Sequence, residues 1–241
     1  MIGLFTDFGP NGPYLGQMEA VLRFSAPNID IIDLINNAPL SDPWLSAFLL
    51  AAVQRNFPEH SVILCVVDPG VGGNRLPVVL HADGKWFVGP DNGLLNCVAI
   101  QAQAAQWYKI AWKPEKLSKS FHGRDLFAPI AALIALEKVS DQIECYCGPA
   151  LKDCPSDLDA IVYFDHYGNA ITGRRYTTTL DGKTIFLAGG ERIPQAGTFC
   201  EVEEGRAFWY CNSSGQVELA VNKGRAQQIL NLSLGDGFCF G

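Results

Sequence analysis

Residues 61–75 read Ser61-Val62-Ile63-Leu64-Cys65-Val66-Val67-Asp68-Pro69-Gly70-Val71-Gly72-Gly73-Asn74-Arg75. The first seven residues are a nearly unbroken run of β-branched and aliphatic side chains. Such a run is typical of a strand that is buried on both faces in the middle of a sheet. The run stops at Asp68, because Pro69 cannot extend the hydrogen-bond ladder of a strand. Three glycines follow, and Arg75 closes the segment.

The positions of Asp68 and Arg75 indicate a binding site. Open α/β sheets bind their ligands just beyond the carboxyl ends of the strands. An acid and a base at such an end therefore predict a site for a small molecule. The alternative reading of these residues is an ordinary Gly-rich turn in which Asp68 and Arg75 are exposed to solvent.

The rest of the first half has the pattern of alternating strands and helices. Strands are expected over residues 2–5 and 29–34. Asp42-Pro43 has the order of an N-cap followed by a first-turn proline. Asp125 is expected to be the N-cap or a first-turn acid of a strongly apolar helix. These elements predict an α/β domain with a central, mostly parallel sheet over residues 1–150.

The second half has a different pattern. Gly, Pro, Cys and Asp dominate residues 147–157, and we place the domain boundary there. Short alternating strands separated by turn signals are expected beyond it, over residues 160–164, 170–172, 184–187, 198–202, 207–210 and 217–221. This pattern predicts a small all-β, barrel-like domain over residues 151–241.

Charge and hydropathy exclude some classes of protein. The net charge is −7 over 241 residues, which disfavours nucleic acid as a partner because phosphate contacts need a basic face. No apolar run approaches the roughly 20 residues of a membrane span, so no membrane partner is expected. The N-terminal residues lack the pattern of a signal peptide, and we expect a cytoplasmic location.

The eight cysteines form no Cys-x-x-Cys pair. Cys145, Cys147 and Cys154 lie near one another in sequence, which leaves a metal site as an alternative. A structural zinc site, however, needs four ligands, typically in paired spacings. We therefore expect reduced thiols and no metal, with Cys65 in the buried strand and Cys97 in a helix.

Polar side chains gather where strands or loops are expected to end. They are Asp7, Asp68, Arg75, His122, Asp165, Asn169 and Asn212-Ser213-Ser214. The aromatic side chains of Phe8, Trp44, Phe121, Tyr167 and Trp209 lie beside some of them in sequence. Carboxylates and amides interleaved with aromatic rings suit a nucleoside, because rings stack on adenine and a carboxylate accepts from ribose hydroxyls. The alternative for each aromatic residue is packing in the core.

A series of motifs runs in order over nearly the whole chain. They are Thr6-Asp7-Phe8-Gly9, Asp42-Pro43-Trp44, Val67-Asp68-Pro69-Gly70-Val71-Gly72 with Arg75, Gly89-Pro90-Asp91-Asn92-Gly93-Leu94, Phe121-His122-Gly123-Arg124-Asp125, Asp165-His166-Tyr167-Gly168-Asn169 and Asn212-Ser213-Ser214-Gly215. Together they resemble the motifs of the S-adenosyl-L-methionine (SAM) hydrolases, also called SAM hydroxide adenosyltransferases. These proteins are relatives of the bacterial fluorinating and chlorinating enzymes.

The resemblance implies a fold and an activity. It implies an N-terminal α/β domain, a C-terminal β-barrel domain and a homotrimer in which each site lies between the N-domain of one subunit and the C-domain of the next. The implied reaction converts SAM and water to adenosine and L-methionine, with SAM as substrate and no cofactor.

The resemblance also implies residue roles. Asp68, Arg75 and His122 match the residues that handle hydroxide. The implied substrate-binding residues are Asp7 for ribose, Phe8, Trp44, Phe121, Gly123 and Tyr167 around the nucleoside, Asp165 for the methionine amine, Asn169 for adenine, and Ser213 and Ser214 for the methionine carboxylate. Ser214 falls where the fluorinating enzyme has an arginine.

The chemistry is consistent with these residue types. The sulfonium of SAM leaves as a neutral thioether, so the reaction needs an oxygen nucleophile and no general acid. Arg75 is expected to stabilise hydroxide character, Asp68 to orient the pair, and His122 to take the proton. Two alternatives stay open: a SAM-dependent halogenase, whose halide the charge of Asp68 would repel, and a protein that binds SAM or adenosine without turnover.

Overall fold

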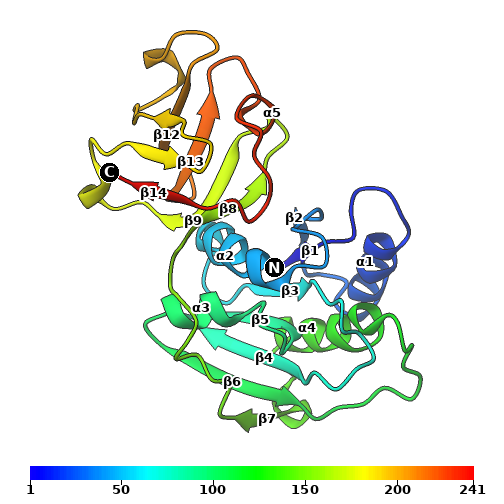
Figure 1. Ribbon diagram of the computed structural model, residues 1–241. Helices are drawn as coiled ribbons and strands as arrows, with labels where there is room; N and C mark the ends of the chain where they lie inside the picture. Colours follow the sequence, from blue (N-terminus) through cyan, green and yellow to red (C-terminus); the bar gives the residue numbers. More distant parts are fainter. The chain divides into compact units, whose positions relative to one another are not determined.

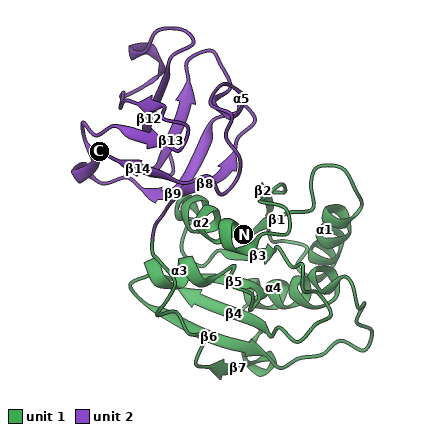
Figure 2. Ribbon diagram, viewed as in Figure 1, with its two compact units in different colours: residues 1–156 green, residues 157–241 purple.

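The computed structural model describes residues 1–241, which divide into two units, residues 1–156 and residues 157–241 (Figure 2). Each unit has its own sheets and its own hydrophobic core. None of the helices is both long enough and apolar enough to cross a membrane.

A seven-stranded sheet forms the centre of the first unit (Figure 1). Its strands, in spatial order, are β2 (Ile31–Ile35), β1 (Ile2–Thr6), β3 (Val62–Val66), β5 (Lys85–Pro90), β4 (Pro77–Ala82), β6 (Ala105–Ile110) and β7 (Ile143–Tyr146). The first four strands pair in parallel, and β4, β6 and β7 alternate in direction. Five of the seven strands therefore run the same way, which confirms the expected mostly parallel sheet.

The strand predicted from residues 61–67 is β3. It lies between β1 and β5, and every one of its side chains is buried. This position agrees with the unbroken apolar run, because a central strand covered on both faces has no solvent-facing positions.

The helices of the first unit are α1 (Tyr14–Ser25), α2 (Pro43–Val53), α3 (Asn96–Gln101) and α4 (Ala128–Ala135). The predicted cap of α2 is confirmed, since Asp42 Oδ1 accepts a hydrogen bond of 2.9 Å from the backbone N–H of Leu45. Pro43 occupies the first turn, where its missing N–H would have had no partner within the helix.

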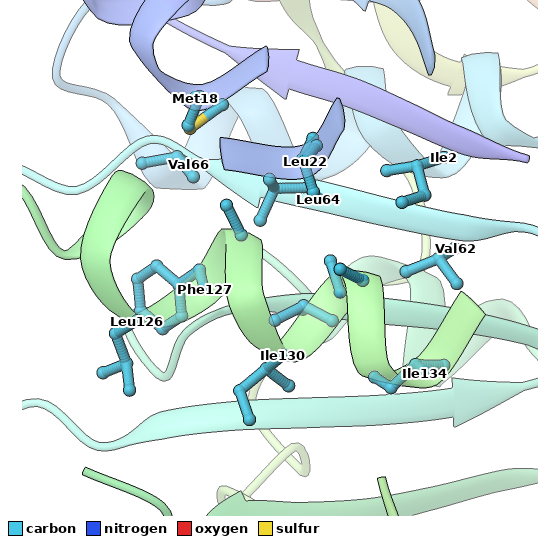
Figure 3. Close-up of a cluster of buried hydrophobic side chains, with 14 of the residues drawn as sticks. Ile2, Met18, Leu22, Val62, Leu64, Val66, Leu126, Phe127, Ile130 and Ile134 are labelled. Carbon is cyan, nitrogen blue, oxygen red and sulfur yellow. The ribbon is translucent and has the colours of Figure 1, made fainter. Parts of the chain in front are cut away.

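One face of the sheet packs against α1 and α4 (Figure 3). The fully buried side chains include Ile2 and Leu64 from the strands, Leu22 from α1, Phe127 from the residue before α4, and Ile130 from α4. Burial of each such side chain contributes about 1.5–3 kcal/mol. This core fixes the strands whose ends carry the polar residues.

The opposite face is also covered, because the side chains of Phe5 and Ile63 on it are fully buried. Phe57, which follows α2 along the chain, lies directly over Gly3 of β1. A Cβ added to Gly3 would come within 2.8 Å of the Phe57 ring. The first strand thus needs glycine where an aromatic ring lies against its backbone.

The helix expected to begin at Asp125 has a different start. Residues Gly123–Phe127 form a π-helical turn, and α4 begins only at Ala128. Asp125 is therefore not an N-cap, and the alternative of an acid in the first turn applies to this π-helical turn. Pro129 has no N–H to give to the carbonyl of Asp125, so the α-helical ladder cannot extend back through this position.

The second unit contains two antiparallel sheets. The four-stranded sheet has the order β12 (Ala207–Cys211), β13 (Gln216–Val221), β9 (Ala170–Arg175) and β8 (Leu158–Phe164). The three-stranded sheet has the order β11 (Arg192–Ile193), β10 (Ile185–Leu187) and β14 (Phe238–Phe240). A short helix, α5 (Ala226–Ile229), was not expected from the sequence.

The barrel-like prediction holds only in its coarser form, an all-β unit. The two sheets do not close into a barrel, because only single-residue bridges join them, between Ala160 and Gly237 and between Gln195 and Trp209. Pro194 precedes Gln195 and has no N–H, which limits the ladder beyond β11.

The strand predicted over residues 198–202 is wrong. Residues Phe199–Glu201 form a 3-10 turn. The Glu201 carboxylate accepts a hydrogen bond of 2.8 Å from the backbone N–H of Gly197, and the Phe199 ring packs on Phe208 at 5.0 Å. These local contacts replace the strand that the alternating pattern indicated.

Candidate active site

Two aspartates follow the carboxyl ends of neighbouring parallel strands. Thr6 at the end of β1 pairs with Val66 at the end of the parallel strand β3. Asp7 and Asp68 follow these strands, and both line a cavity of about 110 Å³. The parallel register therefore brings together two acids that are 61 positions apart in the sequence.

Asp68 and Arg75 form a buried ion pair. Arg75 Nε lies 3.0 Å from Asp68 Oδ1 and 3.1 Å from Oδ2, and Arg75 Nη2 also contacts Oδ2. Their side chains are only 4% and 9% exposed, respectively. This burial excludes the alternative of a solvent-exposed turn. The Arg75 guanidinium also lies over the Phe127 ring at 5.3 Å.

His122 joins this pair through its ring. Its Nδ1 lies 2.9 Å from Arg75 Nη2. A guanidinium has only donors, so Nδ1 accepts and the neutral ring carries its proton on Nε2. Burial, followed by the positive charge of Arg75, lowers the pKa of His122, although Asp68 and Asp125 oppose the shift. The structure thus gathers Asp68, Arg75 and His122, as the sequence predicted, around a neutral imidazole.

The loop before His122 is held from two sides. Gly72, at φ +79°, lies so close to the backbone of Lys119 that a Cβ would overlap its carbonyl oxygen. On the other side, Asp125 Oδ2 accepts a hydrogen bond of 2.8 Å from the backbone N–H of Ser118, and Arg124 Nε donates to Asp125 Oδ1 at 2.6 Å. These contacts fix the position of His122 relative to Arg75.

Asp7 is held by a residue that the sequence did not single out. Its Oδ2 accepts a hydrogen bond of 2.9 Å from the backbone N–H of Ser41, which also lines the cavity. Desolvation raises the pKa of Asp7, and the charge of Asp68 adds to the increase. Ser41 has a positive φ of 55°. A serine before Asp42-Pro43 gave no sign of this contact in the sequence.

The aromatic candidates of the first unit separate into two groups. Phe8 and Phe121 line the cavity with Gly123, and their rings lie 5.8 Å apart. Trp44 is 43% exposed on the first turn of α2, packs edge-on against Phe48 and does not line this cavity. The structure therefore gathers Phe8, Phe121 and Gly123 but not Trp44.

A second group of candidates lines a pocket of about 580 Å³ in the second unit. It contains Asp165, Tyr167 and Asn169, together with Phe199, Tyr210, Lys223 and Arg225, which the sequence did not single out. Asn169 donates two hydrogen bonds to the Asp165 carboxylate. Its side-chain Nδ2 donates to Oδ2 at 2.9 Å, and the backbone N–H of Asn169 donates to Oδ1 at 2.8 Å. Tyr167 is 74% exposed at the tip of this turn.

The remaining candidates do not line either pocket. Ser213 and Ser214 lie in the hairpin between β12 and β13, where the Ser214 backbone N–H donates to Asn212 Oδ1 at 2.9 Å. Trp209 belongs to the core, as its alternative reading proposed, and its Nε1 donates to the Lys183 carbonyl. Its neighbour Tyr210, on the other face of β12, is the one that reaches the pocket.

The cysteines form no disulfide bond. Cys65 and Cys97 are buried in β3 and α3, as predicted, whereas Cys145 on β7 and Cys147, which follows the last residue of β7, are exposed. No three His, Cys, Asp or Glu side chains lie together as a metal-binding group.

Two family models together cover most of this chain. The N-terminal domain of the SAM hydroxide adenosyltransferases matches residues 2–144, and the C-terminal domain of the same family matches residues 159–239. The chain belongs to the SAM hydroxide adenosyltransferase family. Its two matched regions lie within the two units of the structure.

Proteins with assigned names are similar to nearly the whole chain. An (R)-S-adenosyl-L-methionine hydrolase of Thermus thermophilus is 35% identical over 95% of both chains. One of Methanocaldococcus jannaschii is 29% identical over 96% of this chain and 92% of the relative. A fluorinase of Nocardia brasiliensis is 25% identical over 98% of this chain and 94% of the relative.

The fold is shared as well. The crystal structure of an uncharacterized conserved protein from Thermotoga maritima matches with a TM-score of 0.87 and 29% identity, and the match covers 100% of this chain and 99% of the other.

Proposed function

We propose that this protein hydrolyses SAM to adenosine and L-methionine by in-line attack of water on the 5′-carbon of the ribose. The observation that carries the proposal is the buried cluster of Asp68, Arg75 and His122 beside the cavity lined by Asp7. The relatives named as SAM hydrolases over nearly the whole chain support it.

The reaction makes one bond and breaks one. The water oxygen bonds to C5′ while the C5′–S bond breaks, and its electron pair stays on sulfur, so methionine leaves as a neutral thioether. Water releases one proton to the solvent, and its remaining O–H becomes the 5′-hydroxyl of adenosine. Because the sulfonium is already a good leaving group, we propose that no cofactor and no general acid take part. The task of the residues is to supply an oriented oxygen nucleophile.

We assign the nucleophile to the side of the cluster that faces the cavity. The fixed positive charge of Arg75 stabilises hydroxide character on the attacking oxygen, and Asp68 orients the guanidinium through its two oxygens. Since Arg75 occupies Nδ1 of His122, Nε2 is the ring nitrogen that remains for the attacking oxygen. His122 therefore orients this oxygen as a donor, and it accepts the proton only if the Arg75 hydrogen bond is released.

The proposed substrate contacts are divided between the two pockets. Asp7 binds the ribose hydroxyls, with Phe8, Phe121 and Gly123 beside the sugar, and the second unit supplies Asp165 for the methionine amine and Asn169 for adenine. Trp44, Tyr167, Ser213 and Ser214 keep their expected roles as substrate contacts. The polar groups of the two pockets support this division.

We further propose a homotrimer in which the N-terminal unit of one subunit and the C-terminal unit of the next form each site. The division of the nucleoside contacts between the two units supports this assembly. Sedimentation that finds a fully active monomer at the assay concentration contradicts it. The cytoplasmic location also stays a prediction.

The test is product analysis after incubation with SAM in ¹⁸O-labelled water, with chloride and fluoride present. Hydrolysis at C5′ gives adenosine with the label in its 5′-hydroxyl, together with methionine. A 5′-halo-adenosine would instead identify a halogenase. SAM that is bound but recovered intact would identify a binding protein. The Arg75→Ala variant serves as the control for background hydrolysis.

A further inference from the structure

A second buried carboxylate lies in the four-stranded sheet of the second unit. Glu218 on β13 is only 4% exposed and directly opposes Tyr210 on β12. Its Oε1 accepts a hydrogen bond of 2.6 Å from the Tyr210 hydroxyl, and its Oε2 accepts one of 2.8 Å from Asn212 Nδ2. Both of these partners are neutral, which is unusual because buried acids are most often paired with a cation.

The Asn212 side chain links Glu218 to the hairpin between the two strands. While its Nδ2 donates to Glu218, its Oδ1 accepts from the backbone N–H groups of Ser214 and Gln216, each at 2.9 Å. The amide thus has one orientation that satisfies both of its ends. Glu218 fixes that orientation, and through it the turn that carries Ser213 and Ser214.

The Tyr210 side chain carries the other contact into the pocket. Tyr210 lines the pocket with Asp165 and Asn169, and its hydroxyl is engaged by Glu218. The ring is also held by Phe199, whose centroid lies 5.5 Å away at 70°. Because the hydroxyl is bound to Glu218, this contact fixes the orientation in which the Tyr210 side chain lines the pocket.

Burial raises the pKa of Glu218, and the nearby charge of Asp165 also raises it, while the hydrogen bonds from Tyr210 and Asn212 oppose the shift. An apolar residue at this position would avoid the desolvation of a carboxylate. The carboxylate instead accepts one oriented hydrogen bond with each oxygen, from Tyr210 and from Asn212.

We propose that Glu218 is a positioning residue that couples the two ends of the SAM site in the second unit: through Tyr210 it holds the wall of the nucleoside pocket, and through Asn212 it holds the Ser213-Ser214 turn. This inference rests on the proposed function. Glu218 acts through these two residues and touches no reacting atom.

The main test compares the wild-type full-length protein with two variants, a single and a double substitution. Glu218→Gln replaces one acceptor oxygen by an amide donor and is expected to raise the KM for SAM and the Kd for adenosine about tenfold, which corresponds to roughly 1.4 kcal/mol. The turnover number should change less, because Asp68, Arg75 and His122 belong to the other unit. The exchange Asn212→Asp/Glu218→Gln reverses the hydrogen bond and should restore both constants.

A matched pair of variants covers the case in which Glu218→Gln does not fold. Tyr210→Phe removes one hydroxyl–carboxylate hydrogen bond beside the pocket. Tyr176→Phe removes one of 2.5 Å to Asp181, on a tyrosine of the same unit that does not line the pocket. Tyr210→Phe should raise the Kd for adenosine severalfold, and Tyr176→Phe should leave it unchanged.

Several results overturn the inference. A Glu218→Gln variant with a lower melting temperature but with KM and Kd within twofold of wild type would assign the residue to stability alone. An exchange variant that does not restore affinity would also contradict the inference, as would equal effects of the two tyrosine variants. Adenosine affinity separates this inference from the proposed function, because a wild-type protein that binds adenosine without hydrolysing SAM refutes only the proposed function.

Discussion

The first unit buries the Asp68 carboxylate against a guanidinium, whereas the second unit buries the Glu218 carboxylate against a phenol and an amide. Both carboxylates are largely withdrawn from solvent: the Asp68 side chain is 4% exposed, and Glu218 is 4% exposed as a residue. They differ in the charge of the hydrogen-bond partner. Arg75 contacts Asp68 and His122 through Nε and Nη2, and in the proposed mechanism its fixed charge also stabilises the attacking oxygen. Tyr210 and Asn212 carry no charge and can only hold positions.

This difference indicates two uses of a buried acid. A charged partner creates a local field, which suits a site where charge changes along a reaction. Neutral partners create a fixed geometry, which suits a site that selects and orients a substrate. Variants of the first cluster should therefore change turnover, and variants of the second should change affinity.

The largest effect is expected for Arg75→Ala. It removes the charge that stabilises the nucleophile and leaves the buried Asp68 without its partner, so kcat should fall about 10³-fold, with a smaller change in SAM affinity. Steady-state rates and directly measured dissociation constants test this. Arg174→Ala is the matched control, because Arg174 also forms a two-point ion pair with an acid, Asp159, in the other unit. Near wild-type turnover with lost affinity would make Arg75 a substrate clamp.

His122→Ala is expected to reduce kcat about 10²-fold, within the range for a lost donor in an active site. His122→Gln retains a side-chain N–H donor but cannot accept a proton. If His122 orients the nucleophile, the Gln variant should keep much more activity than the Ala variant. Equal losses in the two variants would instead assign His122 the role of general base, which the sequence suggested.

The pH profile provides a second test of His122. Its lowered pKa means that the ring is neutral down to a pH below its usual value of 6.5. Since the proposed role needs the neutral ring, kcat should fall only as the pH decreases below 6.5, and the His122→Gln variant should lack this decrease. A profile that falls between pH 8 and pH 7 would contradict the assignment.

Gly72→Ala is expected to reduce kcat about tenfold by a purely geometric route. Both the positive φ and the overlap with the Lys119 carbonyl oppose a side chain here, at a cost of about 1–3 kcal/mol for the strained backbone. Part of that strain should move the His122 loop away from Arg75. Gly182→Ala, at φ +73° with nothing near its Cβ, controls for backbone strain alone.

The smallest effect on turnover is expected for Asp7→Ala. A ribose contact exists in both the ground and the transition state, so the variant should raise the Kd for SAM about tenfold or more and leave kcat nearly unchanged. Because the pKa of Asp7 is raised above 3.8, affinity in the wild type should begin to weaken at a higher pH than for an ordinary aspartate. Binding measured from pH 7 down to pH 4 tests this.

The sequence predicted the parts of this molecule that depend on local pattern. The apolar run before Asp68 identified the central strand, Asp42-Pro43 identified the start of α2, and the Gly-rich turn indicated that Asp68 and Arg75 lie close together. Each of these features is encoded within a few residues, so no tertiary contact was needed to recognise it.

Features that depend on distant partners could not be read in this way. Ser41 reaches Asp7 through a backbone N–H, which any residue type carries. The alternation in β12 showed that Trp209 and Tyr210 face opposite sides but not which side faces the pocket. Glu218 looked like an ordinary residue of an alternating strand, because its importance comes from Tyr210 and Asn212.

The π-helical turn after His122 has a consequence for changes in chain length. It winds about one residue more than an α-helical turn does, and it lies directly between His122 and α4. Deleting one residue from Gly123–Phe127 would allow regular α-helix to form and would rotate the preceding residues by about 100° around the helix axis. The histidine would then turn away from Arg75 even if the deleted residue were Leu126 or Phe127, which belong to none of the motifs. Variant libraries of this segment should therefore change residue types and keep the number of residues constant.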